Sequence, residues 1–231
     1  MRRHEATKAE IVAAAWEVAR EKGLAGLTLG DVAARVGMRV PSLYSYFASK
    51  NDIVDAMFAQ GNDQFLACIR SRRAATSDPP ATRRAATTTA SAVPSRLARQ
   101  RLREAFRTYF EFCVADPVRY QLLFQRTIPG FVPSDASYAK AVEVLALLRQ
   151  ELAEVGLVGD QADEDLLTAL SSGLVDQQIA NDPGGDRWAR LVDEVADMAY
   201  DHIVRKRRRK LAGQPAARTG RARGPVRIEG P

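Results

Sequence analysis

Side chains that can hold phosphate or read base edges gather between residues 28 and 50 of this 231-residue chain. Among them are two hydroxyls, two phenols, an arginine and a lysine: Thr28, Ser42, Tyr44, Tyr46, Arg39 and Lys50. Hydroxyl and cationic groups donate hydrogen bonds to phosphate oxygens, and an arginine can also bind guanine O6 and N7 bidentately. The segment therefore has the chemistry of a nucleic-acid contact.

Groups for catalysis or metal binding are scarce. The two histidines, His4 and His202, lie outside any metal or nucleophile constellation, and the strings GxSxG, HExxH, GxGxxG and the Walker motif are missing from the sequence. Cys68 and Cys113 lie in apolar helical patterns without metal-ligand spacing, as expected of buried thiols in a reducing compartment. We therefore expect no enzyme, no cofactor and no metal site.

Two short helices must position the phosphate-binding groups. The Thr28 hydroxyl is suited to cap a helix from about Leu29 to Val36, and Gly37 can adopt the left-handed backbone of a tight turn before a second helix, Val40 to Phe47. Ala33 is small enough for the two helices to cross closely. Apolar residues expected to face a shared core are Val32, Val36, Leu43 and Phe47. This is the pattern of a helix-turn-helix, whose second helix fits the DNA major groove.

Longer helices flank this pair. Apolar residues recur at helical spacing from Glu5 to Lys22, and Gly23 supplies a C-terminal stop. After the pair, Ser49 with Asp52 makes a capping box that opens a helix through about Arg72. The first 73 residues therefore hold four helices.

The approach helix, the two-helix unit and the string Leu43-Tyr-Ser-Tyr-Phe-Ala-Ser-Lys50 together resemble the TetR (TetR/AcrR) family of transcriptional regulators over residues 8–58. The resemblance implies that Thr28, Tyr44 and Lys50 hold DNA phosphates. It also implies a set that reaches bases or nearby phosphates, Arg39, Val40, Pro41 and Ser42, with Tyr46 beside it. Many relatives have Ser or Thr at Arg39 and Gly at Pro41, so the recognition surface differs here. Arg39 could bind guanine or a phosphate, and the sequence favours neither.

The remainder of the chain predicts further helices and no strand. The expected ranges are 96–114, 118–125, 135–155, 163–180 and 187–204, which gives an all-α fold. We divide it into a helix-turn-helix domain (1–48), a connecting helix (49–73), a flexible linker (74–95), an antiparallel helical ligand-binding and dimerisation domain (96–204) and a basic disordered tail (205–231).

Aromatic residues crowd the helices expected at 96–114 and 118–125, as they would in either a core or a pocket. The resemblance implies a small-molecule effector between the middle helices of the second domain. Our candidate lining is Phe65, Tyr109, Phe110, Cys113, Leu123, Phe124 and Leu147. The resemblance also implies a homodimer through helices 163–180 and 187–204, although packing within one subunit explains their periodicity equally well.

Charge is unevenly distributed. Residues 205–231 carry ten basic side chains and one acidic, whereas residues 104–204 carry seven basic and eighteen acidic. Arg205 to Lys210 can be a solvated helix end or a DNA-contacting arm. No apolar run approaches the roughly 18 residues of a membrane span, and the charged start lacks a signal-peptide core, so we expect a cytoplasmic protein.

These features predict a transcription regulator, most simply a repressor: a homodimer on a near-palindromic double-stranded DNA operator, re-tuned by an unknown small-molecule effector. A pivot of the helix Ser49 to Arg72 would couple effector and operator. The sequence leaves open that the protein activates transcription and does not repress it. The alternative is a helical adaptor that binds a protein and not DNA, for which an exposed Tyr44, Tyr46 and Lys50 face would have no use.

Overall fold

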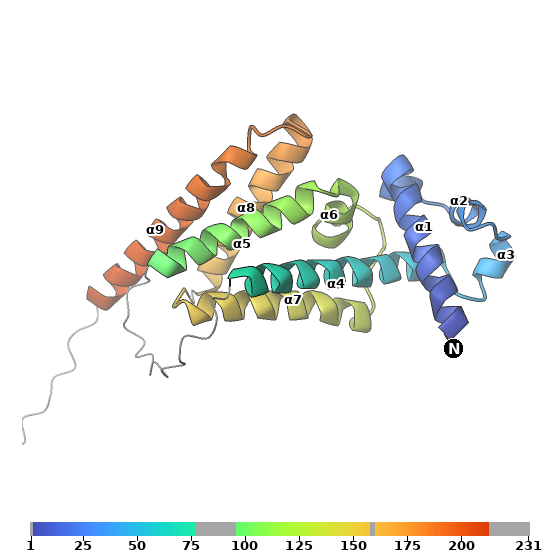
Figure 1. Cartoon of the computed structure of the whole chain (residues 1–231), viewed down its shortest axis with the longest axis horizontal. Coiled ribbons are helices and arrows are strands. Elements are labelled where there is room, and N and C mark those ends of the chain that lie inside the picture. The colour runs from blue at the N-terminus through green and yellow to red at the C-terminus, as the bar shows by residue number, and fades with distance from the viewer. Residues whose placement is uncertain (1, 77–95, 158–159, 213–231) are drawn as a thin grey trace, which may run out of the picture.

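The computed structural model describes residues 2–76, 96–157 and 160–212, and within these ranges all regular structure is helical (Figure 1). The elements in chain order are α1 (Arg2–Gly26), α2 (Leu29–Arg35), α3 (Val40–Leu43), α4 (Lys50–Thr76), α5 (Arg96–Val114), α6 (Pro117–Phe124), α7 (Asp135–Glu154), α8 (Gln161–Asn181), the 3-10 turn η1 (Ala189–Leu191) and α9 (Val192–Ala212). The predicted all-α class is confirmed.

Helices α1 to α3 form a compact unit at one end of the molecule (Figure 1). The Thr28 hydroxyl caps α2 by accepting from the Asp31 amide at 3.2 Å, as predicted. Gly37 takes φ 68°, a left-handed value that its lack of a Cβ allows, in the turn between α2 and α3. Gly23 also has positive φ and kinks the end of α1, which continues to Gly26.

The long helix α4 contributes to two hydrophobic cores. Its first turns bury Ile53, Val54, Met57 and Phe58 against α1 and α2, and its later turns bury Phe65 and Ile69, with other apolar side chains, in the core of the second domain. The first core therefore extends ten residues past the predicted domain boundary at residue 48. The boundary was placed too early because that prediction followed the motif, whereas the core needs apolar side chains from the next helix.

Polar contacts hold α4 against α7. Near the start of α4 the Asp55 carboxylate accepts from the Ser134 amide at 2.7 Å and the Ser137 hydroxyl at 2.7 Å. Further along, Lys140 donates to Asp63 at 2.6 Å. These contacts, with the shared core beneath them, support α4 along most of its length.

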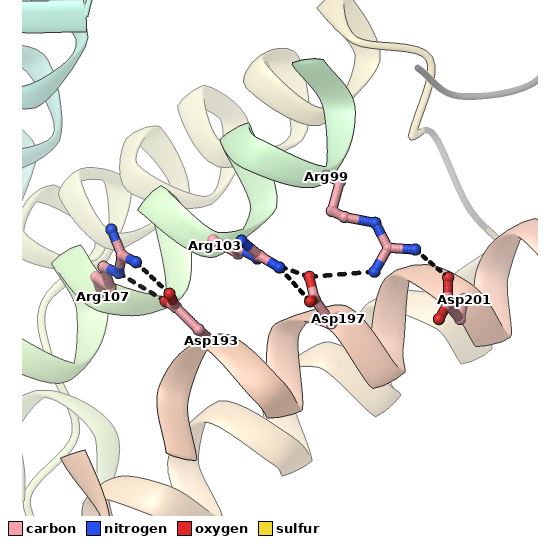
Figure 2. Close-up of polar contacts among 6 residues, drawn as sticks. All are labelled: Arg99, Arg103, Arg107, Asp193, Asp197 and Asp201. Atoms are coloured by element: carbon pink, nitrogen blue, oxygen red, sulfur yellow. Dashed lines mark hydrogen bonds and ion pairs between the residues drawn. The ribbon is translucent and has the colours of Figure 1, made fainter. Parts of the chain in front are cut away.

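Helices α5 and α9 lie side by side and are joined by a ladder of ion pairs (Figure 2). The arginines stand four residues apart on α5 and the aspartates four apart on α9: Arg99, Arg103 and Arg107 face Asp201, Asp197 and Asp193. A spacing of four residues returns to the same helix face, so each rung repeats the one before. The three rungs fix the register of α9 on α5.

The end of α9 corrects the predicted limits of the last domain. The helix runs to Ala212, eight residues beyond the predicted Val204, so the tail predicted to begin at residue 205 starts inside a helix. Ion pairs explain the extension, because Lys206 and Lys210 bind Asp160 at 2.6 and 2.8 Å. The prediction for residues 213–231 lies outside the described residues.

Other helix limits differ from the predicted ones by smaller amounts. Helix α4 reaches Thr76, so the predicted linker begins no earlier than residue 77, and its residues 77–95 lie outside the described ranges. The helix predicted from Arg187 begins as η1 at Ala189. No helix in the described part of the chain is long and apolar enough to cross a membrane.

Candidate DNA interface and effector cluster

Helix α3 buries one side and exposes the other. Leu43 is 1% exposed and packs in the first core, whereas Tyr44, the next residue, is 54% exposed. Pro41 and Ser42 are also exposed, and Val40 is half-buried against the core. The helix ends at Leu43 and not at the predicted Phe47. Residues 44–46 form a turn, in which the amides of Tyr46 and Phe47 donate to the Leu43 carbonyl at 2.8 and 2.9 Å. The result is a short, outward-facing element with a polar tip.

Arg39 is the residue before α3 and is exposed. Its side chain makes no capping bond, and the described part of the chain offers it no ion-pair partner. Pro41 lies in the first turn of α3, where its missing N–H leaves no helix bond unmade. The guanidinium is therefore available to an external acceptor.

Thr28 has a structural task besides any contact with DNA. Its hydroxyl accepts from the Asp31 amide and donates to the Asp31 carboxylate at 2.7 Å. Hydrogen bonds from Lys22 and Thr28 hold the pKa of Asp31 below its usual range. A phosphate at Thr28 would compete with Asp31 for the hydroxyl proton.

Helix α1 completes the face with two residues that the sequence reasoning missed. The His4 ring stacks on Tyr46 at 4.7 Å between centroids, and the Lys8 ammonium lies 5.6 Å from the centre of the Phe47 ring. Lys50, partly buried, begins α4 beside this turn. The four-residue spacing of His4 and Lys8 was the available signal, since it puts both on one side of α1.

Three of the predicted effector residues come together in the other domain. The Phe65, Tyr109 and Phe124 rings meet pairwise with centroids 5.3 to 6.0 Å apart. The other four, Phe110, Cys113, Leu123 and Leu147, belong to or pack against the same core. Phe124 is 40% exposed, so the cluster reaches the surface there.

The cluster has a polar edge on α8. The Tyr109 hydroxyl lies 3.1 Å from Ser172, and Tyr120 donates to Asp176 at 2.8 Å. Burial raises the pKa of Tyr109 far above its ordinary value and that of the Cys113 thiol to about 12, so both are protonated at neutral pH. The sequence reasoning missed Ser172 and Asp176, because nothing local links them to aromatic residues 63 and 56 positions earlier.

The comparisons with known proteins bear on the first of these sites. Residues 11–57 match the family model described as bacterial regulatory proteins, tetR family. This segment of the chain is therefore similar to the DNA-binding region of TetR-family regulators. The match contains every residue of the predicted DNA-contacting set, Thr28 to Lys50, whereas His4 and Lys8 precede it.

Relatives of the whole chain are more distant. The HTH-type transcriptional activator FasR of Mycolicibacterium smegmatis is 26% identical over 118 residues, which cover 51% of this chain and 45% of FasR, so the match spans about half of either protein. The fatty acid degradation regulator FadR of Bacillus halodurans has a TM-score of 0.58 at 19% identity, over 84% of this chain and 94% of its own. FadR of Bacillus subtilis, solved with stearoyl-CoA, has a TM-score of 0.55 at 16% identity, over 83% and 97%. These structures share the fold.

The matched segment is thus of the kind that binds DNA in TetR-family regulators, and the chain shares its fold with the two FadR structures. In the described ranges no group of three or more His, Cys, Asp or Glu side chains is arranged to hold a metal ion.

Proposed function

We propose that this chain is a dimeric repressor that binds a near-palindromic operator through α3 and releases it when a small apolar effector enters the aromatic cluster. The exposed tip of α3, over the buried Leu43 and within the segment that matches the TetR model, is the observation that carries the proposal.

Each DNA contact follows from the chemistry of its side chain. Arg39 and Ser42 are exposed at the start of α3, where a recognition helix meets base edges. Tyr44 and Lys50 flank them with a phenol and an ammonium suited to phosphate oxygens. Thr28, Val40, Pro41 and Tyr46 complete the proposed contact set. A dimer would place two such helices in successive major grooves about 34 Å apart.

The dimer is proposed to form through α8 and α9. Met198 on α9 is 60% exposed, and Leu167, Leu170 and Val195 are only partly buried by their own chain. A second copy would remove this apolar surface from water, at about 25 cal/mol per Å².

The effector is proposed to bind at Phe65, Tyr109 and Phe124, with Phe110, Cys113, Leu123 and Leu147 around them. The clustered rings and a protonated Tyr109 suit an apolar ligand with one hydrogen-bonding group. A fatty acyl thioester is the first compound to test, since FadR of Bacillus subtilis was solved with stearoyl-CoA.

Two connections would carry the signal to the DNA-binding unit. Helix α4 contributes to both cores, and Arg20 of α1 binds Asp116, the N-cap of α6, at 2.7 Å. An effector that pushes on Phe65 or Phe124 would move α4 and α6 relative to α1. It must bind the released spacing better than the operator-bound one, because equal affinity shifts nothing.

Selection of bound sequences from a random duplex pool, followed by titration of the enriched site at two salt concentrations, tests the proposal. Enrichment of a palindrome with nanomolar affinity is expected. Salt-sensitive binding without enrichment would contradict it and favour the adaptor alternative. A reporter behind the selected operator then tests the sign of regulation, since FasR is named an activator.

A further inference from the structure

The ion-pair ladder between α5 and α9 ends in an excess of arginine. Its aspartates recur every four residues on α9 up to Asp201, and the next position in that register is Arg205, followed by Arg208 one turn later. On α5, Arg96 precedes the last ladder arginine, Arg99, by one turn. Beyond the last rung in Figure 2, arginine therefore stands on both helices.

These arginines line a surface concavity of about 470 Å³ between the start of α5 and the second half of α9. Four arginines line it, Arg96, Arg99, Arg205 and Arg208, together with Tyr200, Asp201 and Val204. A volume of this size lies within the range of about 300–1,000 Å³ that is common for small-molecule sites. We call it the arginine basin.

The basin holds more positive charge than its own carboxylate can balance. Asp201 already binds Arg99, and its carbonyl accepts from Arg205 at 3.1 Å. Arg96 and Arg208 have no partner among the described residues. Like charges around one concavity repel one another, and a bound anion would relieve that repulsion.

Operator DNA is not the anion that fits. The basin lies at the far end of the molecule from α1–α3, with α4 and α7 extended between them (Figure 1). If α3 is in a major groove, the basin faces away from that duplex. Its ligand must therefore come from solution.

We propose that the arginine basin binds a small anion with two or three linked phosphates, such as the diphosphate or triphosphate group of a nucleotide. Guanidinium groups pair bidentately with phosphate oxygens, and several forks on two helices match several linked phosphates better than one isolated charge. The anion would bridge α5 and α9 beyond the last rung of the ladder. The site is separate from both the DNA face and the aromatic cluster.

Calorimetric titration of the full chain with pyrophosphate and tripolyphosphate, at fixed ionic strength and without DNA, tests the proposal. Binding of one anion per chain is expected, with at least tenfold preference over sulfate and a rise in the thermal midpoint, because a ligand of the folded state stabilises it. The variant Arg96→Gln/Arg208→Gln should lose at least tenfold in affinity. Arg209→Gln, the same change one residue away and outside the basin wall, should retain it.

Three results would overturn the proposal. Sulfate binding as tightly as tripolyphosphate would indicate general charge screening, and so would equal losses in Arg209→Gln. Operator affinity that falls in Arg208→Glu as much as in a DNA-face variant would make the basin a DNA contact. Far-ultraviolet circular dichroism of each variant checks that it is folded.

Discussion

Arg39 differs from Arg20 and Arg35 in having no ion-pair partner among the described residues. Arg20 binds Asp116, and Arg35 binds Glu17 and Glu21 at 3.0 and 2.5 Å, whereas the described part of the chain gives Arg39 no carboxylate. A guanidinium held free beside a recognition helix can read guanine through both of its N–H edges.

Arg39→Ala should therefore change sequence preference. If Arg39 reads a base, the variant loses about 1–3 kcal/mol on the preferred site and tolerates other bases at one position per half-site. Arg39→Lys is the matched control, because it keeps the charge without the bidentate fork. In vitro selection with all three proteins measures the effect, and an unchanged selected motif would leave Arg39 as a phosphate contact.

Lys50→Ala should act on all sequences alike. A lysine that contacts phosphate releases about one counterion, so its loss should lower the slope of log affinity against log salt by about 1 without changing the preferred site. Lys210→Ala removes the same charge at the other end of the molecule and should leave that slope unchanged. The measurement is fluorescence anisotropy over a salt series, and an unaltered slope in Lys50→Ala would remove this residue from the contact set.

At the scale of single residues, the sequence predicted contacts within one helix turn but not contacts between separate helices. The Thr28 and Ser49 caps follow from a hydroxyl three residues before the amide that it accepts from, and both bonds are present at 3.2 Å. The stacking of His4 on Tyr46 depends on how α1 crosses the turn after α3, and the Tyr109–Ser172 contact depends on where α8 lies. The residues of each pair lie too far apart in the sequence for a local pattern to predict their contact.

Among the elements, the start of α8 is tied to the end of α9. Asp160 caps α8 by accepting from the Asp163 amide at 3.2 Å, and the same carboxylate binds Lys206 and Lys210. Hydrogen bonds from these two lysines hold the pKa of Asp160 far below its ordinary value of 3.8. The end of α9 could not be read from the sequence, because its partner lies about fifty residues earlier.

Asp160→Asn should destabilise the fold in a pH-dependent way. Asparagine keeps the cap and loses the charge. Because the folded-state pKa is depressed, the charge contributes stability above the unfolded pKa near 3.8 and loses it as pH falls toward the folded pKa. The thermal midpoint should thus be lower in the variant at pH 7, with a difference that shrinks below about pH 4.

Thermal melts of both proteins across pH, followed by circular dichroism, measure this difference. Asp186→Asn is the control, since the described chain shows no ion pair at Asp186 and the change should give little pH-dependent difference. A midpoint difference that stays constant down to pH 3 would rule out the Asp160 charge as its source.

The DNA-contacting unit and the proposed dimer surface lie in different parts of the molecule. The DNA-contacting unit occupies one end, and the proposed dimer surface on α8 and α9 belongs to the other domain (Figure 1). Helix number, order and class were predictable from periodicity, whereas the packing of α9 along α5 was not, since many pairings of amphipathic helices satisfy the same pattern.

Met198→Arg should separate the dimer. A charge at this exposed position would have to be buried against the second copy, so light scattering after size exclusion should report a monomer. Operator affinity should fall by about 100-fold or more, because two linked half-site contacts become independent. Val142→Arg is the matched control, an equally drastic change at an exposed apolar position of α7. Dissociation by Val142→Arg alone would move the dimer surface to α7.

The two cores share α4, and this has a consequence for folding. A fragment that stops at residue 48 would lack Ile53, Val54, Met57 and Phe58, and also Leu122 of α6, all of which are buried in the first core. The helix-turn-helix segment alone therefore lacks part of the core that it needs to fold. Its unfolding should coincide with that of the second domain in one cooperative transition. Any ligand that stabilises the second domain also makes the DNA-binding unit harder to unfold, even if the same ligand lowers the affinity for DNA.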